Sequence, residues 1–175
     1  MSEAQSLSYD QILAAVLLAY VTLERLLELV LARRNTRALF AEGAYEVGRG
    51  HYPLLVGLHV VWLLSLWALL AAGEARLAPA AALAYVTVQV LRLWTVSSLG
   101  RYWTTRIVVA PRAPLVRSGP YRFLRHPNYL VVVLEIALLP LALGSWALAL
   151  GFSIANAGAL VWRIRVEEAA LAARR

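Results

Sequence analysis

The sequence has 175 residues, of which 61% are hydrophobic and 15% are charged, whereas a soluble domain is about half apolar and roughly a quarter charged. This composition excludes a disordered chain and favours a single membrane domain. The absence of cysteine excludes disulfides, thiol catalysis and cysteine-ligated metal sites. A net charge of +7 would suggest nucleic-acid binding in a polar protein. The charge asymmetry of a membrane protein explains it better, so we expect no nucleic-acid partner.

Five apolar stretches come close to the roughly 20 residues that a helix needs to cross a bilayer core. The last two are short and are separated only by Gly144, with Pro140 just before it, which predicts a tight helical hairpin. The sequence therefore predicts an all-α, polytopic membrane protein with about five transmembrane helices. In chain order the stretches are residues 9–31, 52–72, 79–98, 128–143 and 145–162.

The arginines predict the orientation of these helices. Most of them lie in segments 32–51 and 99–127 and in the tail after residue 162, whereas the remaining connections contain only Arg76. By the positive-inside rule the N-terminus is outside and the C-terminus is cytoplasmic, as an odd number of crossings requires. We expect one integral membrane domain in which residues 1–98 are scaffold helices and residues 99–175 carry any site, on the cytoplasmic side.

Polar, aromatic and special-backbone residues are concentrated just before the fourth stretch. Pro127 is suited to begin a helix, whose free first-turn amides could hold an anion such as a carboxylate. The alternative is an interfacial belt of Arg, Tyr and Trp side chains at the headgroup level. The side chains with hydrogen-bonding or stacking groups here are Tyr121, His126, Asn128 and Tyr129.

A second group of charged residues directly follows the fifth stretch. If that helix continues, Arg163 and Glu167 lie one turn apart on one face, next to Glu168. An arginine fork can hold an anion, and a carboxylate can bind an ammonium group. The alternative is a surface salt bridge among the arginines that the positive-inside rule expects.

Five ionisable residues fall at membrane depth, where charge is expensive and often functional. We expect Glu24, Glu28 and Arg92 to be paired for structural reasons, with Arg25 available as a further partner. For Glu135, packing in the interior and lining a pocket are equally open, so it is a candidate catalytic residue.

The three histidines do not form a metal site. They are scattered along the chain, and no His-Glu-x-x-His pattern occurs. We interpret His51 as an interfacial residue and His59 as a core residue whose hydrogen bonds are satisfied. We therefore expect no metal.

Two motifs together resemble those of the isoprenylcysteine carboxyl methyltransferase family of integral membrane enzymes. The first is Arg-His-Pro-Asn-Tyr at 125–129, preceded by Gly-x-Tyr at 119–121. The second is Arg-x-x-x-Glu-Glu at 163–168. The resemblance covers residues 99–171, and the first three stretches agree with the family only in number.

The resemblance implies methyl transfer from S-adenosylmethionine within the membrane. It assigns Arg163 to the substrate, so we take Arg163 as a candidate catalytic residue, and we add Glu135 and Glu168 as candidates from their carboxylate chemistry. It also implies a lipophilic small-molecule or prenylated acceptor whose alkyl tail enters sideways from the membrane lipids. The residues that it assigns to the cofactor are Pro114, Leu115, Val116, Tyr121, His126, Pro127, Asn128, Tyr129 and Glu167.

Two departures from the pattern concern the acceptor. Eukaryotic members have a histidine where this chain has Ala113 and a glutamine where it has Arg106. Residues 100–106 and 113–116 are more similar to a bacterial branch of the family. Some members of that branch O-methylate long-chain alkylpyrones or alkylresorcinols. A carboxylate or an acidic enol needs no general base, whereas a phenol needs one, for which Glu135, Glu168 and His126 are candidates. This branch implies the inner (plasma) membrane of a bacterium, with the cofactor bound on the cytoplasmic side.

Two other classes of function compete with this interpretation. Membrane sterol reductases resemble the family in their C-terminal region, and a nicotinamide cofactor could use the same basic pocket. A transporter or assembly protein without catalytic activity is the second alternative, although the inverted repeats common in transporters are not visible in the sequence.

Overall fold

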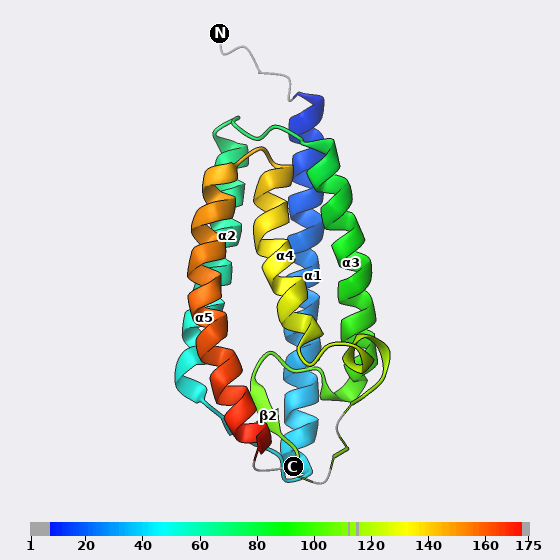
Figure 1. The fold of residues 1–175 in the computed structure, drawn as a ribbon. Helices are drawn as coiled ribbons and strands as arrows, with labels where there is room; N and C mark the ends of the chain where they lie inside the picture. Colours follow the sequence, from blue (N-terminus) through cyan, green and yellow to red (C-terminus); the bar gives the residue numbers. More distant parts are fainter. Residues whose placement is uncertain (1–7, 112, 115, 173–175) are drawn as a thin grey trace.

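The computed structural model describes residues 8–111, 113–114 and 116–172 of the chain. In this part five helices form an elongated bundle, with α1 beginning at one end and α5 finishing at the other (Figure 1). The predicted all-α membrane protein is confirmed. The helices are α1 (Tyr9–Ala41), α2 (Tyr52–Ala71), α3 (Pro79–Leu99), α4 (Pro127–Ala142) and α5 (Trp146–Ala172). They are joined by the 3₁₀ turns η1 (Arg49–His51), η2 (Gly100–Tyr102) and η3 (Gly119–Arg122) and by the strands β1 (Tyr45–Val47) and β2 (Ile107–Val109).

Length and apolar composition suit these helices to a bilayer. Among the described residues, three helical segments are long and apolar enough to cross it: 52–71, 79–102 and 146–170. Helix α4 is apolar but shorter, and α1 is long but carries Glu24, Arg25 and Glu28 in its middle. The chain is thus a multi-pass integral membrane protein.

Both terminal helices extend beyond the predicted apolar stretches. Helix α1 begins with a capping box, in which Ser8 and Gln11 exchange side-chain and backbone hydrogen bonds, and it continues past residue 31 to Ala41. Helix α5 continues past residue 162 to Ala172. Hydropathy marks where an apolar surface ends, whereas the backbone hydrogen bonds of a helix can continue through polar residues.

The hairpin between α4 and α5 has the predicted tight turn. Gly144 adopts φ +81°, which is unfavourable for residues with a Cβ atom. The α2–α3 connection is bonded to this turn, because Arg76 N donates to Leu143 O (3.1 Å) and Ala78 N donates to Ala142 O (2.9 Å). The two connections are therefore held together at the end of the bundle where α1 begins.

A small antiparallel sheet, which the sequence did not predict, lies at the opposite end (Figure 1). Tyr45 pairs with Val109 and Val47 with Ile107. Ile107 and Val109 are buried. The sheet ties the α1–α2 connection to the α3–α4 connection.

Helix α4 packs between α3 and α5 (Figure 1). The half of the bundle nearest the hairpin has an apolar core of large side chains from α1, α2, α3 and α4. Polar and charged side chains are enclosed further along the bundle, on the way to the sheet. The fully buried members of the apolar core include Leu18, Trp62, Leu66, Tyr85, Ile136 and Leu139.

Candidate functional site

The two sequence motifs meet at the first turn of α4. The Tyr129 hydroxyl donates a hydrogen bond to Glu167 and accepts one from Arg163 Nε at 2.9 Å. The guanidinium of Arg163 also lies 5.7 Å from the centre of the Tyr129 ring. Because α5 is unbroken to Ala172, Arg163 and Glu167 lie one turn apart on the same face, as expected.

A pocket of about 170 Å³, here called the polar pocket, surrounds this contact. It lies between the segment that connects α3 to β2, the η3–α4 connection and the end of α5. Its lining includes six of the predicted site residues, together with the motif residue Arg125 and with Tyr102 and Arg106. The six are Tyr121, His126, Asn128, Tyr129, Arg163 and Glu167.

The side chains of the polar pocket have defined electrostatic surroundings. Burial raises the pKa of the Tyr121 phenol, and the nearby Glu167 carboxylate raises it further, so Tyr121 is a neutral hydrogen-bond donor. The His126 ring stacks on Tyr129 with ring centres 5.3 Å apart, and its Nε2 lies 3.6 Å from Glu168. As predicted, Pro127 begins α4, and no side chain caps the helix at His126.

A second pocket, of about 260 Å³, extends from the same place into the bundle. This apolar pocket is lined mainly by aliphatic and aromatic side chains of α1, α2, α4 and α5. Leu26 of α1 and Val60 of α2 belong to its wall, although they are 56% and 49% exposed on the surface of the bundle. The pocket therefore opens between α1 and α2, on a surface that faces lipid in a membrane.

The polar and apolar pockets share part of their walls. The side chains common to both are Trp103, Thr104, Asn128, Tyr129 and Arg163. The Asn128 Oδ1 atom is buried and has no hydrogen-bond partner among the described residues. Such an atom is costly to leave unpaired.

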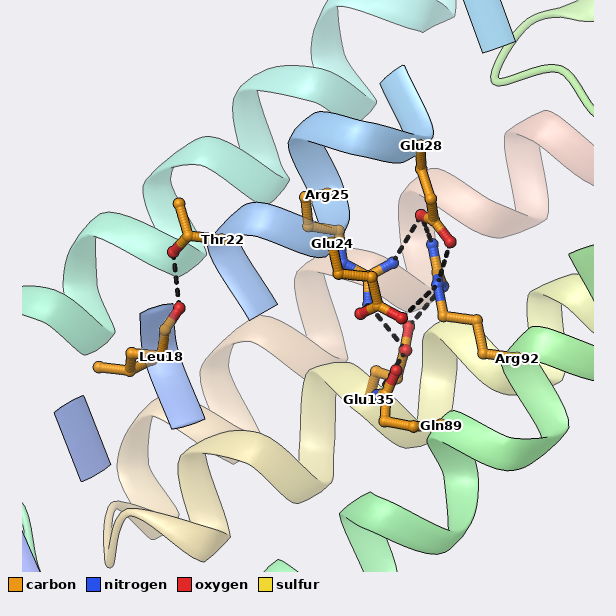
Figure 2. Close-up of polar contacts among 8 residues, drawn as sticks. All are labelled: Leu18, Thr22, Glu24, Arg25, Glu28, Gln89, Arg92 and Glu135. Carbon is orange, nitrogen blue, oxygen red and sulfur yellow. Dashed lines mark hydrogen bonds and ion pairs between the residues drawn. The ribbon is translucent and has the colours of Figure 1, made fainter. Parts of the chain in front are cut away.

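Glu135 belongs to a buried ionic cluster, and it lines neither pocket. Arg25 and Gln89 donate to its Oε1 at 2.7 and 2.9 Å, and Arg92 donates to its Oε2 at 2.7 Å (Figure 2). Arg92 also donates from Nε to Glu28 at 2.6 Å. The ionic cluster consists of Glu24, Arg25, Glu28, Arg92 and Glu135, with Gln89, and it joins α1, α3 and α4 (Figure 2). It shows the pairing expected of Glu24, Glu28 and Arg92.

The other predicted site residues have different positions. Pro114 and Val116 are described but line neither pocket, and Leu115 lies outside the described residues. Pro127 is buried at the start of α4. Glu168 is exposed at the edge of the polar pocket, where it faces His126.

The sequence did not identify several residues that line the pockets. Trp103 and Thr104 line both, and their segment is anchored by Asn35 of α1, whose Nδ2 donates to Gly100 O (3.0 Å) and Trp103 O (2.9 Å). Tyr52 lines the apolar pocket and hydrogen-bonds to Thr105. No local pattern in the sequence indicates these long-range contacts.

Arg106 has structural partners. Its guanidinium donates to Glu46 at 2.8 and 3.0 Å and lies 4.6 Å from the centre of the Tyr52 ring. Although Arg106 borders the polar pocket, these contacts join β1, the start of α2 and the segment before β2. Arg106 therefore stabilises the contact between β1, the start of α2 and the segment before β2, next to the polar pocket.

Comparison with known proteins agrees with this geometry. The chain is 40% identical over 159 residues to the uncharacterized protein YpbQ of Bacillus subtilis (strain 168), covering 89% of this chain and 95% of that protein. It is 27% identical over 115 residues to an uncharacterized protein of Haemophilus influenzae, covering 63% of this chain and 66% of that one. No solved structure matches. The model of the isoprenylcysteine carboxyl methyltransferase (ICMT) family matches residues 80–173. This range includes both motifs that form the polar pocket. The chain therefore belongs to this family of membrane methyltransferases.

Proposed function

We propose that the protein transfers a methyl group from S-adenosylmethionine to an oxygen atom of a lipophilic acceptor within the membrane. The observation that carries this proposal is the junction of two pockets of opposite character. A polar pocket bounded by charged residues and an apolar pocket open to lipid share the side chains of Asn128, Tyr129 and Arg163. A reaction between a polar methyl donor and a lipophilic acceptor requires a place where a polar pocket and an apolar pocket meet.

The polar pocket has the chemistry that the methyl donor requires. The Glu167 carboxylate can pair with its ammonium group, and Arg125 and His126 can pair with its carboxylate. Tyr121 and Tyr102 supply aromatic faces for an adenine ring. The residues present therefore fit the donor, whose sulfonium supplies an activated methyl group.

The apolar pocket fits an acceptor with an oxygen-bearing head and a long alkyl chain. The head lies next to Arg163, whose guanidinium can hold an anionic oxygen in line with the donor. The chain leaves between Leu26 and Val60 into the lipid. Arg106 and Ala113 favour the class of enols and phenols made from long-chain polyketides, such as alkylpyrones and alkylresorcinols, over a prenylcysteine carboxylate.

The arrangement of carboxylates bears on the proton of a phenolic acceptor. An enol or a carboxylate arrives ionised and needs no base, whereas a phenol with a pKa near about 10 must lose its proton. Both Glu135 oxygens already accept hydrogen bonds from three donors. The Glu168 carboxylate, which faces His126 at the edge of the polar pocket, is the better placed proton acceptor in this proposal.

The proposal also places the reaction on the membrane. The methyl donor is a cytosolic metabolite, so the polar pocket faces the cytoplasm and the N-terminal end of α1 faces outside. This agrees with the arginine-rich segments that surround the pocket. In a bacterium the membrane would be the inner one.

Calorimetry in detergent with S-adenosylhomocysteine, the demethylated product, tests the donor assignment. The wild-type protein should bind it and should not bind NADPH. Glu167→Ala should weaken the affinity by about tenfold or more, because a charge-assisted hydrogen bond is lost. The matched control is Arg165→Ala, an exposed change on the same helix, which should leave the affinity unchanged. Binding of NADPH instead would favour a reductase, and unaltered affinity in Glu167→Ala would remove Glu167 from the donor site.

A further inference from the structure

One wall of the apolar pocket is lined by polar side chains, with which a simple alkyl or prenyl chain could form no hydrogen bond. His59 of α2, Arg25 and Glu28 of α1 and Arg92 of α3 all line this wall. The side chains of Arg92 and Glu28 are only 5% and 13% exposed. The charged groups are paired with one another in the ionic cluster, but a hydrogen-bonding group that faces an apolar ligand without a partner is unfavourable.

His59 has one ring nitrogen available to a ligand. Its Nδ1 lies 2.9 Å from Leu55 O, and because a carbonyl oxygen can only accept, Nδ1 carries the hydrogen. In neutral imidazole the other nitrogen, Nε2, is then an acceptor. No hydrogen bond to Nε2 is seen in the part of the chain that the structure describes. The expectation that His59 is a core histidine with satisfied hydrogen bonds therefore holds for one nitrogen only.

The ionic cluster beside His59 is paired internally. Arg25 and Arg92 donate to Glu28 and Glu135, and the Arg25 Nε atom is enclosed by protein. The group that a ligand must bring to this wall is therefore one that donates a hydrogen bond to His59 Nε2. On a molecule that is otherwise apolar, such a donor is a hydroxyl.

We propose that this wall, His59 with Arg25, Glu28 and Arg92, is a specificity site for a second hydroxyl on the acceptor, distinct from the oxygen that is methylated. In this proposal the methylated oxygen contacts Arg163 and the second hydroxyl contacts His59, and both residues line the apolar pocket. This inference rests on the proposed function, since it takes the apolar pocket to be the acceptor site.

Direct binding, measured without any methyl donor, tests the inference separately from catalysis. Trp62 and Trp103 line the pocket, so quenching of tryptophan fluorescence reports its occupancy in the full-length protein in detergent. The probes are an alkylresorcinol, which has two hydroxyls, and an alkylphenol of the same chain length that lacks one of them. The wild-type protein should bind the diol about tenfold more tightly, the effect of one buried hydrogen bond.

Substitutions at His59 should control that preference. His59→Leu should bring the two affinities together by weakening diol binding alone, and His59→Gln, which keeps an acceptor oxygen, should restore most of the preference. Ser65→Ala, on the same helix but bonded to its own backbone at Val61, should change neither affinity.

Three results would overturn the inference: equal wild-type affinities, no binding of either probe, or an equal weakening of both by His59→Leu. Loss of methyl transfer with the diol preference intact would instead overturn the proposed function. Conversely, methyl transfer to both probes without a diol preference would leave the proposed function standing and remove the hydroxyl site.

Discussion

The hydroxyl of Tyr129 is held between a cation and an anion one turn apart on α5. Arg163 Nε donates to it at 2.9 Å while it donates to Glu167. The ring of Tyr129 thereby acquires a fixed position at the wall that both pockets share. A single residue of α4 thus couples the shape of the polar pocket to that of the apolar pocket.

Substitution of Arg163 should affect the acceptor more than the donor. Arg163→Ala should lower kcat/KM for the acceptor by about tenfold to a hundredfold, because a charged hydrogen-bonding group at the junction is lost. Arg163→Lys keeps the positive charge but lacks the planar guanidinium, so it should retain only part of the wild-type kcat/KM for the acceptor. Steady-state kinetics with each substrate varied would measure this. Wild-type kinetics in Arg163→Ala would exclude a substrate role, and Arg165→Ala, exposed two residues later, is the control.

At this scale the sequence predicts the site only where a motif marks it. Tyr121, His126, Tyr129, Arg163 and Glu167 were identified by motif and helical spacing, and they line one pocket. Trp103 was noted only as part of a run that resembles the bacterial branch and His59 only as a core histidine, because their places in a pocket depend on contacts between distant segments. Side-chain positions that depend on tertiary contacts cannot be derived from local periodicity.

The helices of the bundle are joined by charge as well as by apolar packing. In the ionic cluster, Glu135 of α4 receives hydrogen bonds from α1 and α3 (Figure 2). Burial of charges is favourable only when the charges are well paired. The paired charges of this cluster therefore connect α1 to α3 and α4.

Removal of the central carboxylate should destabilise the bundle strongly. Glu135→Ala leaves two buried guanidinium groups with one fewer anion, and breaking a buried pair in this way costs about 3–5 kcal/mol. Thermal unfolding in detergent would show a large fall in Tm. Glu42→Ala removes an exposed ion pair with Arg101, whose side chains are 58% and 54% exposed, and should change stability by about 1 kcal/mol or less. Equal effects of the two variants would contradict the structural role of Glu135.

The α4–α5 turn should be sensitive to a single methyl group. A Cβ atom at Gly144 would lie 3.0 Å from Arg76 O, at a φ of +81°, so Gly144→Ala should destabilise by about 1–2 kcal/mol. A Cβ atom at Gly151, inside α5, would have no neighbour within 4 Å. Gly151→Ala should therefore be neutral or stabilising by up to about 1 kcal/mol. Unfolding midpoints of the two variants in the same detergent compare them directly, and a stable Gly144→Ala protein would refute the role of the turn.

The elements of the fold were predicted where apolar length alone decides them. Helices α2 and α3 begin where expected and finish within one residue of the prediction. The prediction for α1 and α5 stopped at the last apolar residue, and each helix continues for another ten residues. The strands β1 and β2 are three residues long, too short to produce a periodic pattern.

The topology of the whole molecule can be tested because the chain has no cysteine, so one introduced thiol is the only one present. Glu74 in the α2–α3 connection and Glu42 after α1 are exposed at opposite ends of the bundle. In intact cells a membrane-impermeant maleimide should label Glu74→Cys directly and should label Glu42→Cys only after lysis. The reverse pattern would place the polar pocket outside the cell and would contradict a cytosolic donor.

The shortness of α4 has a consequence for where chemistry can happen. Helix α4 has 16 residues and α3 has 21. The C-terminal end of α4 lies beside the start of α3, where the two connections are hydrogen-bonded, so the first turn of α4 falls about 8 Å short of the other end of α3. At about 24 Å, α4 is also shorter than the hydrocarbon layer of roughly 30 Å. In a bilayer of that thickness the first turn of α4, where the polar and apolar pockets meet, would lie below the level of the lipid phosphates. A lipid could meet a water-soluble reagent there without either one leaving its own phase.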